Sequence, residues 1–315
     1  MSFNIGVFCR LNWERPDDPF TDSEMLPFLT TIQHQLRRAH ILAIDWRTIH
    51  ADGTASAFDV FAAMRREICL ATIHLIHIFN LGYSSNRSAS LKEKWREFKQ
   101  KLEIINALGV RCINSIEAIS YAIHKDYLID LAKAGLPMIP TKKVTSHITV
   151  SELRQLCMSS YGVVKPANGE CGRLVLPLDK VTEIEMELYR HETDDILLQP
   201  YMAQAKEGEK SLIFLRDYFS HAVLKIPPSW DIRANGPHTG ALVQPYIPSE
   251  NELNLASRVR SAFPYPLDTC RIDMVGSDSR PWIMEVEVVD PAHYCKLDER
   301  HAHRVADFYY KNICD

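Results

Sequence analysis

A hairpin rich in acidic residues near the C-terminus constrains the fold of this chain most strongly. Residues 271–275 and 283–289 are two runs typical of β-strands, and the turn between them contains glycine and proline. Side chains alternate between the two faces of a strand, so we expect one face to carry the apolar residues Ile272, Met274, Met284, Val286 and Val288. The opposite face would carry three carboxylates, Asp273, Glu285 and Glu287.

The predicted hairpin sets Asp273 opposite Glu285 if its turn is symmetric. Like charges opposed across a sheet destabilise it, so this pair needs a compensating partner. A divalent cation with hard oxygen ligands, Mg²⁺ or Mn²⁺, would neutralise the carboxylates. A half-exposed hairpin whose wet face is acidic explains the same residues without a metal, and the hairpin alone leaves both interpretations open.

Length and composition narrow the class of protein. The 315 residues suggest two or three packed subdomains, and 46% hydrophobic with 24% charged residues is typical of a globular protein. A net charge of -4 gives no reason to expect a nucleic acid partner, and no basic amphipathic run suggests a membrane partner. The N-terminus lacks the features of a signal peptide, and the eight cysteines form no Cys-x-x-Cys pair. We therefore expect a cytoplasmic protein with reduced thiols.

Strands and helices are predicted to alternate in the first 114 residues. Strands at 3–8, 41–46, 71–79 and 110–114 are separated by helices at 24–38 and 90–108, while 58–69 combines helical periodicity with charges. This order favours a small parallel α/β domain, whose ligands bind at the carboxyl ends of the strands. Four polar residues at those ends are candidates for the substrate side, or ordinary loop residues: Arg10, Asn12, Asn80 and Arg87.

The predicted secondary structure changes from helices to closely spaced strands at about Gly162. A helix is predicted at 116–134, short strands with hairpin spacing follow from 163 to 225, and helices return at 251–262 and 298–312. Among the strands, Lys165 precedes a turn with Gly169 and Gly172, and glycines let backbone N–H groups approach phosphate oxygens. No Walker A loop is present, and a plain hairpin would have the same residues.

Two further stretches suggest contacts with a phosphorylated ligand. An apolar strand is followed by an acidic turn with Glu207 and Glu209, which could accept hydrogen bonds from ribose hydroxyls or be a solvated loop. Later in the chain, Arg233 could pair in bidentate fashion with a phosphoryl group or a carboxylate.

Taken in order, these features resemble the ATP-grasp superfamily over about residues 114–315. The pattern consists of Lys125, Lys165 with its glycine loop, the apolar strand with its acidic turn, Arg233, Asp273, and the pair Glu285 and Glu287. The chain is most similar to the glutathione-synthetase-like branch, and there to the group of the D-cycloserine-forming cyclo-ligase, in which Ser-His-Ala-Val-x-Lys and Glu-x-Glu recur. The resemblance implies an α/β fold that is α+β in its C-terminal part. It also implies an N-terminal α/β domain at 1–114, a small ATP-grasp subdomain at 115–192 and a metal-binding subdomain at 193–315.

The resemblance assigns the nucleotide contacts. Lys125 and Lys165 would contact the ATP phosphates, with Lys165 also near the adenine, and the loop that contains Gly169 and Gly172 would close over the phosphates. Glu207, in preference to Glu209, would hold the ribose. The adenine would lie against the backbone of three residues, Gln199, Tyr201 and Met202.

The resemblance also assigns the metal and the reacting phosphoryl group. Arg233 and Arg271 would steady the γ-phosphate and an acyl-phosphate. Two Mg²⁺ or Mn²⁺ ions would be bound by three carboxylates, Asp273, Glu285 and Glu287. Many relatives carry Glu-x-Asn at the last two of these positions, so Glu287 is a departure that puts the coordination number in question.

The implied activity is an ATP-dependent ligase that joins the carboxylate of an amino-acid-like small molecule to an amine, between two molecules or within one. ATP would first form an acyl-phosphate, and the products would be an amide, ADP and phosphate. A small-molecule kinase on the same fold and a non-catalytic nucleotide-binding protein are the alternatives. Whether the chain forms a homo-oligomer stays open.

Overall fold

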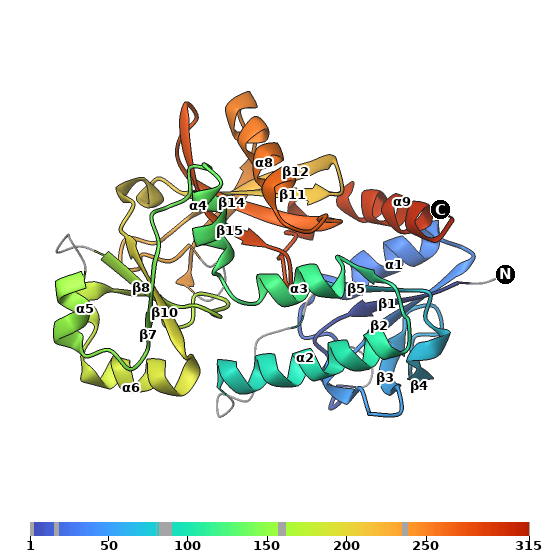
Figure 1. Cartoon of the computed structure of the whole chain (residues 1–315). Coiled ribbons are helices and arrows are strands. Elements are labelled where there is room, and N and C mark those ends of the chain that lie inside the picture. Colours follow the sequence, from blue (N-terminus) through green and yellow to red (C-terminus); the bar gives the residue numbers. More distant parts are fainter. Residues whose placement is uncertain are drawn as a thin grey trace.

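The computed structural model describes residues 3–15, 19–79, 81, 90–156, 162–234 and 239–314, and within them the strands form three sheets (Figure 1). The first sheet has the strand order β4-β3-β2-β1-β5-β6, the second β7-β10-β8-β9 and the third β13-β12-β11-β14-β15. In this part of the chain, no helix is both long and apolar enough to span a membrane.

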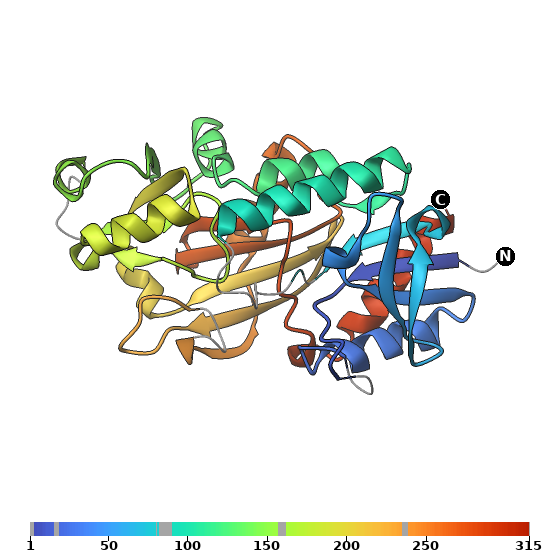
Figure 2. The ribbon, with the colours of Figure 1, turned by 90° about the horizontal axis from the view of Figure 1, so that it is seen from below.

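The first sheet mixes parallel and antiparallel strands. Its parallel part contains β1 (Phe3–Phe8), β2 (Ala39–Ile44), β5 (Leu75–Ile78) and β6 (Cys112–Ile113). Helix α2 (Leu91–Ala107) covers one face, and α1 (Met25–Gln35) with α9 (His301–Cys314) covers the other (Figure 2). The side chains of β1 alternate accordingly, because Phe8 belongs to the core on the α2 side, while Ile5 and Val7 pack with α1 and α9.

The helical periodicity of residues 58–69 was misleading, because these residues belong to an antiparallel hairpin. Strand β3 (Thr54–Asp59) pairs with β4 (Met64–Cys69) and also extends the sheet beside β2. Most side chains of β4 are exposed, so this edge strand has no alternating apolar pattern by which it could be recognised.

The second sheet is antiparallel and contains the predicted lysine strand. It consists of β7 (Lys142–Thr145), β8 (Gly162–Pro166), β9 (Leu176–Pro177) and β10 (Asp195–Pro200), packed against α5 (Val150–Leu156) and α6 (Glu183–Glu192). No helix was predicted from the sequence at the position of α6, although it begins with a capping box between Thr182 and Glu185. Because β10 pairs with β7 and β8, we propose that the small subdomain extends to residue 200, not to 192.

The third sheet contains the acidic hairpin and is also antiparallel. Its strands are β11 (Glu209–Leu215), β12 (Tyr218–Ile226), β13 (Leu242–Tyr246), β14 (Thr269–Ser277) and β15 (Arg280–Glu287), and α8 (Glu250–Ala262) precedes β14. The expected hairpin of β14 and β15 is confirmed, and Asp273 does lie opposite Glu285. A bulge follows this pair, because Met274 pairs with Ile283 and leaves Met284 as the extra residue.

The predicted helix at 116–134 is two helices, α3 (Ile116–Ala122) and α4 (Tyr127–Lys133). Lys125 lies in the break between them, and its backbone N–H donates to the carbonyl of Ala167 at 2.7 Å, outside any helix. A tertiary hydrogen bond therefore replaces a helical one and brings Lys125 next to the glycine loop. The predicted mixed α/β fold is confirmed, with its parallel strands in the first sheet.

Candidate active site

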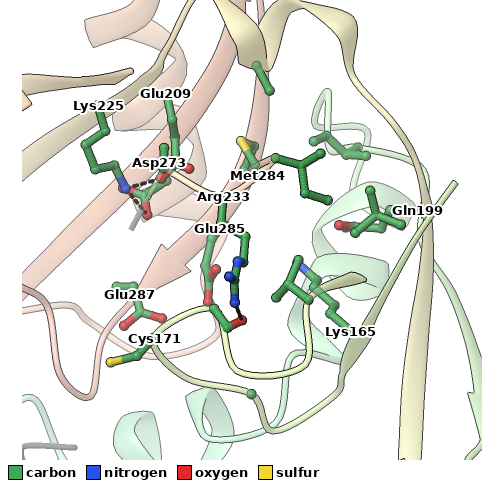
Figure 3. A pocket seen from close by; sticks show the side chains of 18 of the residues that line it. Lys165, Cys171, Gln199, Glu209, Lys225, Arg233, Asp273, Met284, Glu285 and Glu287 are labelled. Carbon is green, nitrogen blue, oxygen red and sulfur yellow. Dashed lines mark hydrogen bonds and ion pairs between the residues drawn. The ribbon is translucent and has the colours of Figure 1, made fainter. Parts of the chain in front are cut away.

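A cavity lies where the second and third sheets meet, and it collects residues from distant parts of the sequence (Figure 3). Except for Glu207, all the predicted site residues line it: Lys125, Lys165, Gly169, Gly172, Gln199, Tyr201, Met202, Arg233, Arg271, Asp273, Glu285 and Glu287. The tertiary structure therefore brings together residues that the sequence separates by up to 162 positions, from Lys125 to Glu287.

Asp273 is the most tightly held carboxylate of the cavity. It is 2% exposed, Arg271 donates to both of its oxygens at 2.8 Å, and the Ser211 hydroxyl donates at 2.6 Å. Lys225 Nζ lies 3.6 Å from Asp273 Oδ2. Burial opposes ionisation, but the charges of Arg271 and Lys225 win and hold the pKa of Asp273 well below its usual range.

Glu285 and Glu287 share one cation, Lys125. Its Nζ forms an ion pair with Glu285 and lies 3.7 Å from Glu287 Oε1. Burial and the neighbouring Glu285 charge raise the pKa of Glu287, whereas Lys125 and Lys165 lower the pKa of Glu285 in spite of its burial. Two carboxylates so close together cannot both ionise without further positive charge.

The three carboxylates suit a hard divalent cation in their chemistry, since oxygen ligands of this charge are those that Mg²⁺ and Mn²⁺ prefer. The conflict between Glu285 and Glu287 gives an independent reason to expect added positive charge there. With the side chains turned toward Lys125 and Arg271, the described residues contain no group of three or more possible ligands in metal-binding geometry. A bound cation would therefore take over charge compensation that the lysine and the arginine now provide.

Lys165 faces the same cavity from the second sheet. It is 8% exposed and pairs opposite Leu197 of β10. Burial, together with repulsion from Lys125, lowers the pKa of Lys165, although Glu285 acts in the other direction. Two neighbouring lysines form an electropositive wall that is suited to a phosphate chain.

The glycine loop is held next to these lysines. Gly172 has a φ of +68°, in the left-handed region that glycine adopts without strain, and its carbonyl accepts a hydrogen bond from Arg233 Nη1 at 3.1 Å. Arg233 also forms an ion pair with Asp231 at 2.6 Å. On the other side of the loop, Glu170 is paired with Lys94 of α2.

The prediction that Glu207 holds a ribose does not fit its position. Glu207 is exposed and lies outside the cavity lining, whereas Glu209 is part of the lining and pairs with Lys225. Glu209 begins β11 and sits in register with Lys225 of β12, which turns it inward. We therefore move the proposed ribose contact to Glu209. Burial raises the pKa of Glu209, and the charge of Lys225 opposes this rise.

Several lining residues were not assigned a role from the sequence. Met284 was expected on the apolar face of the hairpin, but the bulge turns it into the cavity. Asp290 also lines the cavity, just after β15, and no sequence pattern identifies it as a site residue. Of the substrate-side candidates, Arg10 and Asn12 do not line the cavity, and Asn80 and Arg87 lie outside the described residues.

Comparison with known proteins agrees with this architecture. The cycloserine biosynthesis protein DcsG of Streptomyces lavendulae is 25% identical over 245 residues, covering 68% of this chain and 77% of that protein. A glutathione synthetase of Synechocystis sp. is 25% identical over 223 residues, covering 68% of this chain and 64% of that protein. The crystal structure of D-cycloserine synthetase DcsG has the same fold, with a TM-score of 0.73 at 20% identity over 98% of this chain and 99% of that one.

The family described as prokaryotic glutathione synthetase, ATP-grasp domain, matches residues 131–301, which are more than half of the 315 residues and include the glycine loop and the acidic hairpin. The chain therefore belongs to this ATP-grasp family and is an ATP-dependent ligase that forms carbon–nitrogen bonds.

Proposed function

We propose that this ligase transfers the γ-phosphoryl group of ATP to a small-molecule carboxylate and that an amine then attacks the resulting acyl-phosphate. The products are an amide, ADP and phosphate. The observation that supports this proposal most directly is that one cavity is lined by the cations and the carboxylates that we assign to the phosphates and the metal: Lys125, Lys165, Arg233, Arg271, Asp273, Glu285 and Glu287. Such a site catalyses phosphoryl transfer by positioning and charge neutralisation, with no protein nucleophile.

The nucleotide is proposed to lie across the second sheet and the glycine loop. The adenine contacts the backbone from Gln199 to Met202, where Met284 adds apolar surface to the lining, and Glu209 accepts hydrogen bonds from the ribose. Lys125 and Lys165 bind the phosphate oxygens, so Lys125 would leave its carboxylate partners when the nucleotide and metal arrive. The backbone N–H groups of the glycine loop cover the phosphates.

The metal is proposed to be a pair of Mg²⁺ or Mn²⁺ ions held by the carboxylates of β14 and β15, Asp273, Glu285 and Glu287. Held by these carboxylates, the ions would supply positive charge against the phosphate oxygens of the nucleotide. Arg271 keeps Asp273 ionised and oriented, and Arg233, anchored by Asp231, presents its guanidinium toward the acyl-phosphate.

We propose amino-acid-like compounds as the acid and the amine. This proposal rests on the names of two relatives, a cycloserine biosynthesis protein and a glutathione synthetase. The two reacting groups belong to separate molecules or to one molecule, and the product distinguishes these cases, because ring closure gives a cyclic amide with the mass of the substrate less one water.

A product screen tests the proposed function. The protein is incubated with ATP, Mg²⁺ and pooled amino acids, and ADP, phosphate and amides are measured, the amides by mass spectrometry. We expect ADP release to require both a carboxylate and an amine group. A phosphorylated end product formed without any amine would contradict the ligation mechanism and indicate a kinase.

A further inference from the structure

One carboxylate that lines the cavity, Asp290, forms no ion pair with any residue that the structure describes. Asp290 follows β15 by three residues and lines the cavity together with Cys171 and Tyr294. Figure 3 shows Cys171 on the Glu287 side of the cavity, away from Gln199. Asp290 belongs to that side, because it follows Glu287 by three residues, a span of at most about 11 Å. It therefore lies away from the end that we assign to adenine.

The charged groups around Asp290 are engaged elsewhere. Lys94 of α2 forms an ion pair with Glu170, and Arg271 of β14 forms one with Asp273. Both cations lower the pKa of Asp290, as does the backbone N–H of Leu81, but no residue in the described ranges makes an ion pair with it. Asp290 also raises the pKa of the Cys171 and Cys9 thiols, in addition to the effect of burial.

A half-buried carboxylate that lines a ligand cavity can take a cation or a proton from that ligand. Burial raises the pKa of Asp290 to about 6, with Glu170 adding to the rise and Lys94 opposing it. The group is thus ionised at neutral pH but basic enough to accept a proton. An alkylammonium ion matches this site, since it carries one positive charge and several N–H donors.

We propose that Asp290 binds the ammonium group of the amine substrate and removes the proton that blocks its attack. This role rests on the function proposed above, because it supplies the neutral amine that the acyl-phosphate requires. Asp290 would then touch the substrate directly and act as a catalytic base, at the end of the cavity opposite the adenine.

The bonds and protons balance as follows. One N–H bond of the ammonium breaks, and its proton moves to an Asp290 carboxylate oxygen. The nitrogen lone pair forms the C–N bond, and the C–O bond to phosphate breaks with both electrons leaving on the phosphate. The second proton of the amine passes to the departing phosphate, and Asp290 releases its proton to solvent before the next turnover.

The substitution Asp290→Asn tests this role with the acid and amine identified by the product screen. The amide keeps a carbonyl acceptor for the Leu81 N–H but cannot take a proton at neutral pH. We expect amide formation at pH 7 to fall by about 100-fold, within the usual range for loss of a general base. The loss should shrink as the pH rises, since the amine then deprotonates in water. Hydroxylamine, which is already neutral at pH 7, should still give a hydroxamate at nearly the wild-type rate.

A partial reaction separates the two proposals. In the absence of amine, reversible acyl-phosphate formation scrambles oxygen-18 between the bridging and non-bridging positions of ATP, and this exchange should persist in Asp290→Asn. The control Asp59→Asn removes a buried carboxylate of the first sheet, outside the cavity, and should leave every rate unchanged.

Two outcomes would contradict the role of Asp290, and a third would contradict the proposed function. Unchanged amide formation in Asp290→Asn, with isotope exchange intact, would exclude Asp290 as the base. Loss of isotope exchange together with amide formation in this variant would assign Asp290 a structural role instead. Absence of carboxylate-dependent exchange in the wild-type protein would contradict the acyl-phosphate mechanism itself, whatever Asp290 does.

Discussion

Two clusters of buried polar side chains differ in how their charge is compensated. The first, which we name the carboxylate cluster, consists of Asp273, Glu285, Glu287 and the cations that pair with them, Arg271, Lys225 and Lys125. The second, the histidine cluster, consists of four histidines with two hydroxyl groups: His77, His221, His293, His301, Ser220 and Tyr309.

The histidine cluster is neutral and bonds mostly to itself. His301 bonds to His293 at 2.8 Å and to Ser220 at 3.0 Å, and His77 bonds to Tyr309 at 2.7 Å. Burial lowers the pKa of His77 to about 3 and holds the pKa of His301 well below its usual value. The cluster joins β5, β12 and α9, and none of its residues lines the cavity.

This difference in charge compensation indicates which buried polar groups are available to bind a ligand. The carboxylate cluster keeps its charges and faces a cavity, so a ligand can replace the lysine and arginine partners. The histidines of the second cluster are neutral, and most of their hydrogen bonds are made within the cluster. They therefore leave few polar groups for a ligand to contact. Changes in the first should therefore affect turnover, and changes in the second should affect stability.

The largest effect is expected from Asp273→Asn in the carboxylate cluster. Asparagine keeps the shape and the hydrogen bond with Ser211, but it removes the charge that would hold the metal and face Arg271. We expect ADP release to fall by about 1,000-fold or more, with an unchanged circular dichroism spectrum. Asp278→Asn, which removes a carboxylate from an exposed ion pair with Lys210, is the control. Full activity of Asp273→Asn would refute the metal assignment.

Substitution of Glu285 should lower turnover more than substitution of Glu287. Glu285→Gln removes the main ion-pair partner of Lys125 and should lower turnover by about 100-fold. Glu287→Asn keeps an oxygen ligand and removes one of two neighbouring like charges, so we expect a loss of about tenfold or less. Titration of Mg²⁺ against ADP release measures both. Equal losses would show that the two residues are not divided in this way.

A smaller effect is expected at the nucleotide end. Glu209→Gln should raise the KM for ATP by about tenfold, since it weakens a charged acceptor for ribose and leaves Lys225 with Asp273 alone. Glu207→Gln is the matched control, because Glu207 is exposed two residues away and should leave KM unchanged. A rise in KM for Glu207→Gln alone would restore the first assignment of the ribose contact.

The histidine cluster should make stability fall in acid. The folded-state pKa values of its four histidines lie below the ordinary value of about 6.5, so their contribution is complete above pH 6.5 and is lost as the pH falls below it, for His77 down to about pH 3. Each buried histidine lowers the free energy of unfolding by up to about 1.4 kcal/mol per pH unit in that window. Urea unfolding at pH 7.5 and 5.5 measures the slope. His77→Phe should reduce it without changing kcat, and an unchanged slope would exclude His77 as a contributor.

The sequence by itself determined the features that depend on neighbouring residues. Strand alternation put Asp273 and Glu285 on one face of the hairpin, and the helix predicted at 90–108 has the capping box of Ser90 and Glu93 and ends at Gly109, whose φ is +67°. The order of the lysines, glycine loop, arginines and carboxylates indicated the family. These signals are local, because caps, turns and strand alternation act over a few residues.

The tertiary structure alone decided which of these residues meet. The bulge that turns Met284 into the cavity comes from the pairing of β14 with β15, and the break that frees Lys125 comes from its hydrogen bond to Ala167. Glu209 rather than Glu207 faces inward because β11 pairs in register with β12. Asp290 carries no motif at all, and it becomes a candidate base because the chain after β15 passes the end of the cavity. Contacts between residues far apart in the sequence set these positions, and local patterns do not encode them.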